Sequence, residues 1–392
     1  MLIITKPNTT PDQLKHIISE IHKHGFKEDV SKGEEQFTIG VKGVRPFVQL
    51  KYLESFPFVE EVIQISKENK LTSLEYKRGK RSKIKVNDVV IGGKGIVVSA
   101  GPCAVEDIER MRKTLIEKLG KEEFKNKSEK IQNEFSISLN DSLLLLAKDE
   151  DIKVDLTLKI AHAVKKAGAQ ILRGGGFKPR TSPYAFEGSG IPAIKLLKQV
   201  AQIVDMPIVT EVTRPEAVEE VAKYADILQI GTRNAQNFDL LDTVGELGKD
   251  ENLSRPILYK RGKAMTVDET LLAAERIYSH GNPNVIICLR GVTGGVDTEH
   301  MRNRLDVGDI AIFKQKTHLP VWYDPSHSTG RKDLVETVAL QAIVGGADGL
   351  IIDVNTHPNE AMVDGAQALL PSEFEHLMES ITAAANVVGR NI

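Results

Sequence analysis

Eight short hydrophobic runs recur along residues 96–354, and together they predict a barrel of parallel strands. Each run is continuously apolar rather than alternating, as in the segment VIICL at 285–289, which is typical of parallel strands buried on both faces. Amphipathic helical patterns separate many of the runs, at residues 155–167, 191–204, 215–224, 267–280 and 333–344. This alternation predicts an α/β fold, a (β/α)8 TIM barrel. The predicted strands are 96–100, 170–172, 207–210, 227–231, 256–259, 285–289, 320–323 and 349–352.

A residue suited to chemistry follows or ends each run. In a TIM barrel the carboxyl ends of the strands meet on one face, so these side chains become neighbours around one pocket. A single charged residue there is explained as part of a polar rim, but eight in register favour an active site at the barrel mouth. The eight residues are Cys103, Arg173, Glu211, Arg233, Lys260, Arg290, His327 and Asp353.

The first 75 residues predict a separate domain. The pattern is strand 2–5, helix 11–24, strands 27–31 and 37–41, helix 47–53 and strand 59–65, which is the βαββαβ order of a ferredoxin-like domain. The charge-rich stretch 66–83 predicts a linker, and residues 83–90 predict a hairpin that can plug the bottom of the barrel. We therefore expect a domain at 1–75, a linker and capping hairpin at 76–95, and a barrel at 96–392.

The first loop of the barrel is unusually long. About 45 residues separate Glu106 from the next barrel helix, far more than a normal βα loop contains. Residues 108–119 and 141–148 have leucine-rich helical faces, whereas residues 121–134 look like a solvated mixed-charge stretch. We expect a helical insertion at about 108–152, which is either a tolerated surface addition or a lid over the catalytic mouth.

Composition excludes several classes of protein. The net charge is only −2 and both signs are interspersed, so there is no basic stripe for nucleic acid or an anionic membrane. No apolar run approaches the length of a membrane span, and the N-terminus lacks the pattern of a signal peptide. Two cysteines in 392 residues do not make a disulfide framework. We expect a cytoplasmic protein.

Four residues at or just beyond strand ends form a candidate metal site. One thiol, one imidazole and two carboxylates suit a divalent transition metal such as Mn, Fe, Co or Zn, and they disfavour the all-oxygen sites of Mg²⁺ and Ca²⁺. Each residue alone has a simpler explanation, such as a core cysteine or a capping aspartate. Their common position at the barrel mouth favours ligation by Cys103, His327, Asp353 and Asp364.

A second group of candidates is cationic. Arginine forks match phosphate and carboxylate oxygens, so several of them around one pocket favour two phosphorylated substrates. The alternative is a structural ring in which they pair with Glu211, Asp324 and other nearby acids. The cationic residues are Arg173, Lys178, Arg180, Arg233, Lys260 and Arg290.

The most distinctive string is LRGGGFKPRTSPY at 172–184, whose glycines allow close backbone approach and whose hydroxyls can hold phosphate oxygens. With this string the chain resembles 3-deoxy-D-arabino-heptulosonate 7-phosphate (DAHP) synthase, the first enzyme of the shikimate pathway. The N-terminal domain is similar to that of the subgroup in which it serves feedback control by an aromatic amino acid. Further motifs carry the resemblance: AGPC at 100–103, TE at 210–211, IGTRNAQN at 230–237, KRG at 260–262, RG at 290–291 and DPSHS at 324–328.

The resemblance implies a metal-dependent, aldol-like condensation of phosphoenolpyruvate with erythrose 4-phosphate, which gives DAHP and phosphate. It implies Lys178, Glu211 and His327 as catalytic residues, with Glu211 near the reacting carbons. It also implies Cys103, His327, Asp353 and Asp364 as metal ligands, Arg173, Lys178, Arg233, Lys260 and Arg290 around phosphoenolpyruvate, and Arg180, Thr181 and Ser182 on erythrose 4-phosphate.

The sequence departs from the family pattern at three positions. Asp353 replaces a glutamate of the metal site and is one methylene shorter, roughly 1.5 Å of reach. Asn355 stands where histidine is usual, and His357 is a poor substitute ligand because its loop lies beyond the strand end. In the N-terminal domain Asp29 replaces a histidine, which leaves the identity of any aromatic effector open.

Two other functions fit some of these features. One is a related synthase that joins phosphoenolpyruvate to another phosphorylated aldose, although residues 178–182 favour erythrose 4-phosphate. The other is a non-catalytic, ligand-sensing barrel, which Asp353 and the insertion would suit. Barrels of this kind usually associate, and a ferredoxin-like domain offers sheet edges for pairing, so we expect a homodimer or homotetramer.

Overall fold

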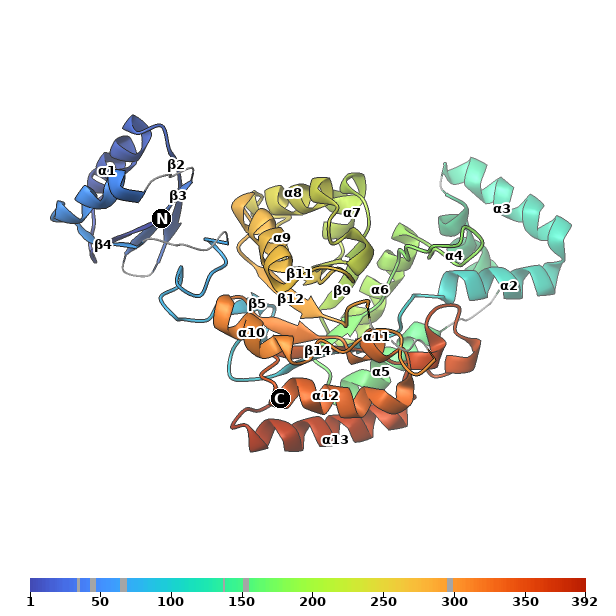
Figure 1. Cartoon of the computed structure of the whole chain (residues 1–392). Coiled ribbons are helices and arrows are strands. Elements are labelled where there is room, and N and C mark those ends of the chain that lie inside the picture. The colour runs from blue at the N-terminus through green and yellow to red at the C-terminus, as the bar shows by residue number, and fades with distance from the viewer. Residues whose placement is uncertain (34–35, 43–46, 64–68, 137, 151–154, 295–298) are drawn as a thin grey trace. The chain divides into compact units, whose positions relative to one another are not determined.

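The computed structural model describes residues 1–392 except 34–35, 43–46, 64–68, 137, 151–154 and 295–298. The chain folds into two compact units. One comprises Met1–Arg81 together with Lys316–His318, and the other comprises Ser82–Gln315 and Leu319–Ile392. Figure 1 shows the helices and strands of both units.

The first unit is built on a four-stranded antiparallel sheet in the order β2-β3-β1-β4. Its first helix starts at a capping box formed by Thr10 and Gln13, and its core includes Ile3, Ile17 and Ile39. The predicted ferredoxin-like fold is confirmed, although the second helix is a 3-10 helix and residues 64–65 of the last predicted strand lie outside the described residues. The elements are β1 (Leu2–Thr5), α1 (Pro11–Lys23), β2 (Lys27–Lys32), β3 (Phe37–Lys42), η1 (Phe47–Ser55) and β4 (Val59–Ile63).

Residues 69–81 pack within this first unit instead of forming a solvated tether. Leu71, Thr72 and Tyr76 are buried, and the Nε2 atom of His318 lies 2.8 Å from the carbonyl oxygen of Leu71. The His318 ring also stacks on Tyr76, with 6.1 Å between the ring centroids. The part of the predicted linker at 66–68 lies outside the described residues.

The second unit is a closed barrel of eight strands, in which every neighbouring pair is parallel. Pairing of the last strand with the first closes the barrel and places Asp353 opposite Gly101. The predicted TIM barrel is therefore confirmed. Its strands are β7 (Val97–Gly101), β8 (Ile171–Arg173), β9 (Ile208–Val212), β10 (Ile227–Ile230), β11 (Ile257–Lys260), β12 (Val285–Leu289), β13 (Val321–Tyr323) and β14 (Gly349–Asp353).

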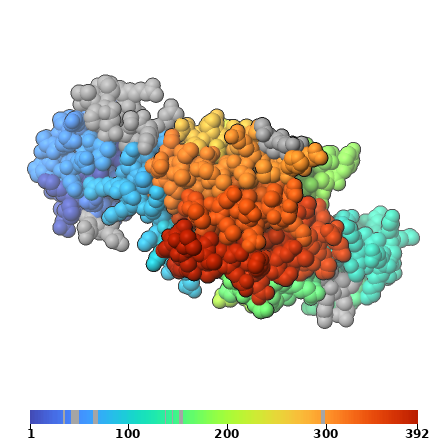
Figure 2. Space-filling view, turned by 60° about the horizontal axis from the view of Figure 1, so that its bottom comes forward, coloured from blue at the N-terminus to red at the C-terminus, as the bar shows by residue number. Residues whose placement is uncertain are grey.

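Helices surround this barrel, and their apolar sides face the strands. The C-terminal quarter of the chain, orange to red in Figure 2, forms a continuous part of the outer surface. None of the helices among the described residues is long and apolar enough to cross a membrane. The barrel helices are α5 (Leu156–Lys166), α6 (Ile191–Val204), α7 (Val218–Ala222), α8 (Phe238–Glu246), α9 (Val267–Ser279), α10 (Asp309–Lys316), α11 (Pro325–Thr329), α12 (Val335–Val344) and α13 (Pro371–Val387).

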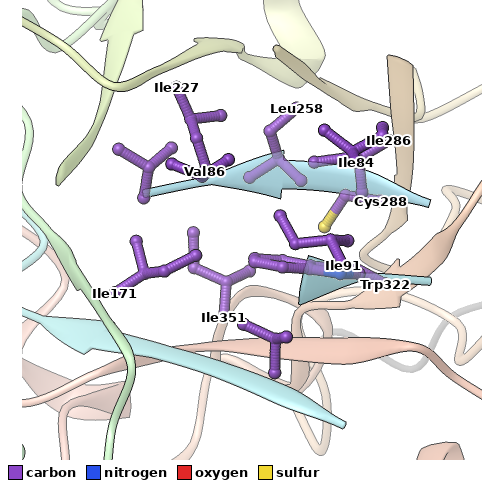
Figure 3. Close-up of a cluster of buried hydrophobic side chains, with 12 residues drawn as sticks. Ile84, Val86, Ile91, Ile171, Ile227, Leu258, Ile286, Cys288, Trp322 and Ile351 are labelled. Atoms are coloured by element: carbon purple, nitrogen blue, oxygen red, sulfur yellow. The ribbon is translucent and has the colours of Figure 1, made fainter. Parts of the chain in front are cut away.

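A hairpin of β5 (Ile84–Val86) and β6 (Val89–Ile91) fills the end of the barrel at the amino ends of the strands. Ile84, Val86 and Ile91 are buried against inward-facing residues of the barrel strands, including Trp322 and Leu258. Figure 3 shows these side chains converging in one apolar layer. The hairpin thus fills the bottom of the barrel.

The insertion after β7 forms three helices: α2 (Asp107–Leu119), α3 (Lys121–Phe135) and α4 (Leu139–Asp149) (Figure 1). The expectation that residues 121–134 form a non-helical solvated stretch is wrong. Phe124 is buried on the side of α3 that packs against the other two helices. On its exposed side Lys127 pairs with Glu123 one turn away, which is the spacing that stabilises a charged helix.

Candidate active site

The carboxyl ends of the strands surround a cavity that is partly open to solvent. Glu211, Gln229, His327 and Asp364 contribute to its wall. Cationic side chains outnumber carboxylates in this wall, so the cavity suits an anionic molecule. The cationic residues are Arg173, Lys178, Arg180, Arg233, Lys260, Arg290 and Arg302.

Glycines at two strand ends let functional side chains fold into this mouth. A Cβ atom on Gly175 would lie 2.4 Å from Cε of Lys178 and 2.8 Å from the carbonyl oxygen of Cys103. A Cβ atom on Gly231 would lie 2.0 Å from Oε1 of Glu211. Any larger residue would therefore displace Lys178 or Glu211.

Two of the cations are held by buried carboxylates. Arg173 pairs with Asp353, and Lys260 pairs with Asp324. All four side chains are almost fully buried, so each charge depends on its partner. These two cations therefore have partners within the protein and also line the cavity.

The other four predicted cations differ from this pattern. Within the described part of the chain, Lys178, Arg180, Arg233 and Arg290 have no carboxylate at ion-pair distance. Arg290 is only 2% exposed, one of its Nη atoms has no hydrogen-bond partner among the described residues, and burial lowers its pKa. Unpaired buried cations such as Lys178 and Arg290 are costly, so this half of the cavity is complementary to a bound anion.

A thiol, an imidazole and a carboxylate converge beside these cations. The Sγ atom of Cys103 lies 3.9 Å from Nε2 of His327 and 3.3 Å from Oδ2 of Asp364. Nε2 of His327 lies 3.5 Å from the same Asp364 oxygen. Ligand atoms about 2.0–2.3 Å from one ion lie roughly 3.3–3.8 Å apart at tetrahedral angles. The three side chains therefore fit a divalent metal ion.

Asp324 orients the imidazole of this cluster. His327 lies on the short helix α11, and the Asp324 carboxylate caps that helix by accepting a hydrogen bond from the His327 amide at 2.9 Å. The same carboxylate lies 3.0 Å from Nδ1 of His327, which leaves Nε2 facing Cys103. Burial lowers the pKa of His327, but the Asp324 carboxylate outweighs this effect and raises the pKa overall.

The cationic wall also changes the acidity of Cys103 and Asp364. Burial raises the pKa of the Cys103 thiol, but Lys178, His327 and Arg173 outweigh burial and bring the pKa down to about 7. Burial likewise opposes ionisation of Asp364, whereas His327 and Arg302 hold its pKa well below the usual range. Both groups are therefore favoured in the ionised form that ligates metals.

Asp353 lies at the edge of this cluster. One of its carboxylate oxygens is 3.6 Å from Nδ1 of His327, and Cys103, His327 and Asp353 each offer a donor atom within 4.8 Å of the others. Gln367 donates a 2.5 Å hydrogen bond to Oδ2 of Asp353, in addition to the Arg173 pair. The Asp353 carboxylate thus lies beside Cys103 and His327 while it also pairs with Arg173.

The structure differs from the sequence interpretation at a few other positions. Thr181 and Ser182 are exposed and lie outside the described cavity wall. Sequence reasoning missed Arg302, which donates to Asp364 at 3.0 Å and to Gln367 at 2.8 Å. Arg302 does not follow a strand directly, so the strand-end pattern gave no signal for it. His357 is exposed, in keeping with its exclusion as a ligand.

Family comparisons agree with this architecture. Residues 152–387 match the DAHP synthetase I family, and residues 1–67 match the DAHP synthase ferredoxin-like domain. A phospho-2-dehydro-3-deoxyheptonate aldolase of Thermotoga maritima is 34% identical over 389 residues, which cover 99% of both chains. A 2-dehydro-3-deoxyphosphooctonate aldolase of Arabidopsis thaliana is 31% identical, over 61% of this chain and 81% of its own.

Solved structures give the same result. The crystal structure of a DAHP synthase from Thermotoga maritima matches with a TM-score of 0.68 and 32% identity, covering 100% of this chain and 98% of that chain. A truncated form of the Thermotoga maritima synthase matches with a TM-score of 0.64 over 82% of this chain. From the barrel, the cationic cavity and these full-length matches, we conclude that the chain belongs to the DAHP synthetase I family and carries the ferredoxin-like domain of DAHP synthases at its N-terminus.

Proposed function

We propose that this protein condenses phosphoenolpyruvate with erythrose 4-phosphate to give DAHP and inorganic phosphate, the first step of the shikimate pathway. Family membership supports the reaction. The observation that carries the proposal is the cavity itself, in which four cations without carboxylate partners among the described residues lie beside the cluster of Cys103, His327 and Asp364. Such a cavity suits two anionic substrates and a metal ion.

In this proposal the cations divide between the two substrates. Arg173, Lys178, Arg233, Lys260 and Arg290 hold the phosphate and carboxylate of phosphoenolpyruvate. Arg180, Thr181 and Ser182 hold the phosphate of erythrose 4-phosphate. Thr181 and Ser182 are exposed on the loop beside Arg180, so their contact requires that loop to turn toward the bound sugar phosphate. Fixed positive groups at both anions orient the reactants and stabilise developing charge.

We propose Cys103, His327, Asp364 and Asp353 as the metal ligands, for Mn²⁺, Fe²⁺, Co²⁺ or Zn²⁺. A bound divalent ion supplies Lewis acidity toward the aldehyde oxygen of erythrose 4-phosphate. Ligation requires the Cys103 thiolate and an unprotonated Nε2 on His327, so metal binding releases protons and depends on pH. Asp324 keeps Nε2 directed at the ion by holding Nδ1 of the same ring.

We assign the proton transfers to Lys178 and Glu211. The enol carbon of phosphoenolpyruvate attacks the aldehyde carbon, and water then adds to the cationic carbon that results. The hemiketal phosphate collapses with loss of phosphate. Glu211 is 8% exposed in the cavity wall. It accepts a 3.2 Å hydrogen bond from Gln229, which orients its carboxylate for proton transfer. Lys178 reaches the same space over Gly175.

Three further proposals concern the whole protein. The domain at residues 1–75 binds a regulatory ligand of the aromatic amino acid class, with Asp29 altering its preference. The protein assembles into a homodimer or homotetramer. It works in a reducing compartment such as the cytoplasm, because the Cys103 thiolate must stay reduced to hold an ion.

A synthase that uses another phosphorylated aldose is the second candidate. It is favoured by the 31% identity to a 2-dehydro-3-deoxyphosphooctonate aldolase. However, that similarity covers 61% of the chain, whereas the DAHP synthase relative matches over 99%. The full-length match favours erythrose 4-phosphate as the acceptor.

The test is consumption of phosphoenolpyruvate with erythrose 4-phosphate by chelator-treated protein, before and after Mn²⁺, Fe²⁺, Co²⁺ or Zn²⁺ is added. We expect metal-dependent turnover that requires both substrates, and competition with arabinose 5-phosphate separates the two acceptors. Cys103→Ser should abolish metal-dependent turnover, whereas Cys288→Ala, at the other buried free cysteine, should retain it. Folded protein that is silent with every metal and both sugars would refute the proposed function.

A further inference from the structure

Glu106 is a buried carboxylate that the proposed reaction does not use. It is 1% exposed, it follows Cys103 by three residues, and it is absent from the described cavity wall. It immediately precedes α2, the first helix of the insertion. Cys103 and Glu106 both lie between the two ranges that match the family models. A carboxylate is buried at such a position only if specific partners compensate for its lost hydration.

The partners of Glu106 lie on the loop that carries Asp364. Its Oε1 atom accepts a 2.7 Å hydrogen bond from the backbone amide of Met362, which is 256 residues away in sequence. Met362 precedes Asp364 by two residues. Glu106 therefore joins the segment after one proposed metal ligand to the segment before another.

The insertion helix α2 adds a second attachment to the same loop. Arg110 lies one turn along α2 and donates to Oε2 of Glu106 at 3.3 Å. The same guanidinium donates to the backbone oxygen of Glu360 at 3.2 Å and to its carboxylate at 3.4 Å. Glu106 and Arg110 thus hold residues 360–362 at two points.

The backbone of Asp364 has an uncommon conformation. Its φ is +54°, in the left-handed region that few non-glycine residues occupy, although aspartate enters it more readily than most. Val363 beside it packs with Cys103 and Ala104 in one buried cluster. The 3.3 Å separation between Sγ of Cys103 and Oδ2 of Asp364 is therefore set by how this loop is fixed to the segment 103–106.

We propose that Glu106, supported by Arg110, is a positioning residue that sets the spacing of Cys103 and Asp364 for metal binding. This inference rests on the proposed metal site. It also assigns a purpose to α2, which anchors the Asp364 loop to the end of β7. Other links from the insertion run elsewhere: Asp107 of α2 accepts hydrogen bonds from Thr157 of α5, and Asn140 of α4 donates to the backbone oxygen of Ser189 at 3.1 Å.

The test is Co²⁺ titration of full-length, chelator-treated variants, followed by the thiolate-to-cobalt absorption band in the near ultraviolet. Glu106→Ala should weaken Co²⁺ binding by roughly 10–100-fold, the usual effect of losing a residue that supports a metal ligand, and should weaken the thiolate band. Glu106→Gln should restore part of the affinity, because its amide oxygen can still accept the Met362 amide. The KM for phosphoenolpyruvate should stay within twofold of the wild-type value in both.

Glu109→Ala is the matched control, because Glu109 lies on the same turn of α2 but pairs only with Arg112 among the described residues. It should bind Co²⁺ like the wild type. Wild-type Co²⁺ affinity and band intensity in Glu106→Ala would overturn the inference. If Glu106→Ala does not fold, Glu106→Gln and Arg110→Ala decide the matter: weakened binding supports the inference, and wild-type binding in both refutes it. Absence of the thiolate band in the wild type would instead refute the metal site itself.

Discussion

Asp353 lies between the proposed metal ligands and a buried arginine. Its carboxylate pairs with Arg173 and accepts a hydrogen bond from Gln367. The imidazole atom of His327 that lies near it, at 3.6 Å, is Nδ1. A glutamate would reach roughly 1.5 Å farther. This side chain therefore lies beside the proposed metal ligands while it also pairs with a buried arginine.

We expect Asp353→Glu to preserve or increase affinity for Mn²⁺ or Co²⁺, because the longer side chain reaches the ion more easily. Asp353→Asn should weaken metal binding and lower the free energy of unfolding by about 3–5 kcal/mol, since Arg173 would remain buried without its counter-charge. Metal titration and urea unfolding measure the two effects. Loss of metal binding in Asp353→Glu would mean that the local backbone has adapted to the shorter side chain.

At the scale of elements, glycines at the strand ends decide which side chains can enter the mouth. The loop after β8 passes Lys178 over Gly175 so closely that no Cβ atom fits. We expect a substitution of Gly175 to affect function more than folding, because Gly175 lies in this loop and outside the barrel core.

Gly175→Ala should therefore lower kcat/KM at least 10-fold by displacing Lys178, with little change in the circular dichroism spectrum. The reason is the 2.4 Å approach of the added Cβ atom to Cε of Lys178. Gly308→Ala is the control, because a Cβ atom there meets nothing within 4 Å. Equal kcat/KM in both variants would contradict the proposed place of Lys178 at the reacting atoms.

The hairpin β5–β6 is the element that closes the other end of the barrel. Ile91 is fully buried in the layer with Trp322 and Leu258, whereas Val90 on the same strand is 43% exposed. Alternate residues of a strand point to opposite faces, so these neighbours provide an internal comparison.

Ile91→Ala should lower the free energy of unfolding by about 2–5 kcal/mol because it leaves a cavity in the plug. Val90→Ala should change it by less than about 0.5 kcal/mol. Urea unfolding followed by the fluorescence of Trp322, the single tryptophan, reports on this layer. Similar losses for the two variants would show that the plug contributes little to the stability of the barrel.

At the scale of the whole molecule, the first compact unit includes one short segment from the second half of the sequence. Lys316–His318 belong to that unit although they follow in sequence from the end of α10, before β13. The imidazole of His318 is buried there beside Leu71 and Tyr76. Burial lowers the pKa of His318 to about 4, with the Leu71 carbonyl opposing this shift.

The stability of residues 69–81 should consequently fall as the pH drops from 6.5 toward 4. In that range the unfolded segment takes up a proton that folded His318 does not, so acid favours unfolding by up to about 1.4 kcal/mol per pH unit. Above pH 6.5 the contribution is complete. Amide hydrogen exchange of residues 69–81, corrected for intrinsic rates at pH 7.5 and 5.0, measures the effect.

His318→Gln should remove this pH dependence and keep a donor for the Leu71 carbonyl. His376→Gln, at an exposed histidine of α13, should leave the dependence as it is in the wild type. The same pH dependence in His318→Gln would exclude His318 as its cause.

The sequence by itself determined the barrel, the ferredoxin-like unit and the residue types at the mouth. These depend on local pattern, because continuous apolar runs specify buried parallel strands and the barrel topology then gathers their ends. The same local reasoning failed for α3, whose buried Phe124 stabilises a helix only through contact with its neighbours. It also missed Arg302, whose partners Asp364 and Gln367 are more than 60 residues away.

Only the tertiary structure decided which charges are compensated. Pairing of Arg173 with Asp353 and of Lys260 with Asp324, and the hydrogen bond from Met362 to Glu106, join residues from different strand ends. Such contacts are fixed by the register and closure of the barrel, not by neighbours in sequence. The chain therefore specifies a cationic mouth through its pattern, but the choice between a structural ion pair and an anion-binding residue depends on distances that exist only once the barrel is closed.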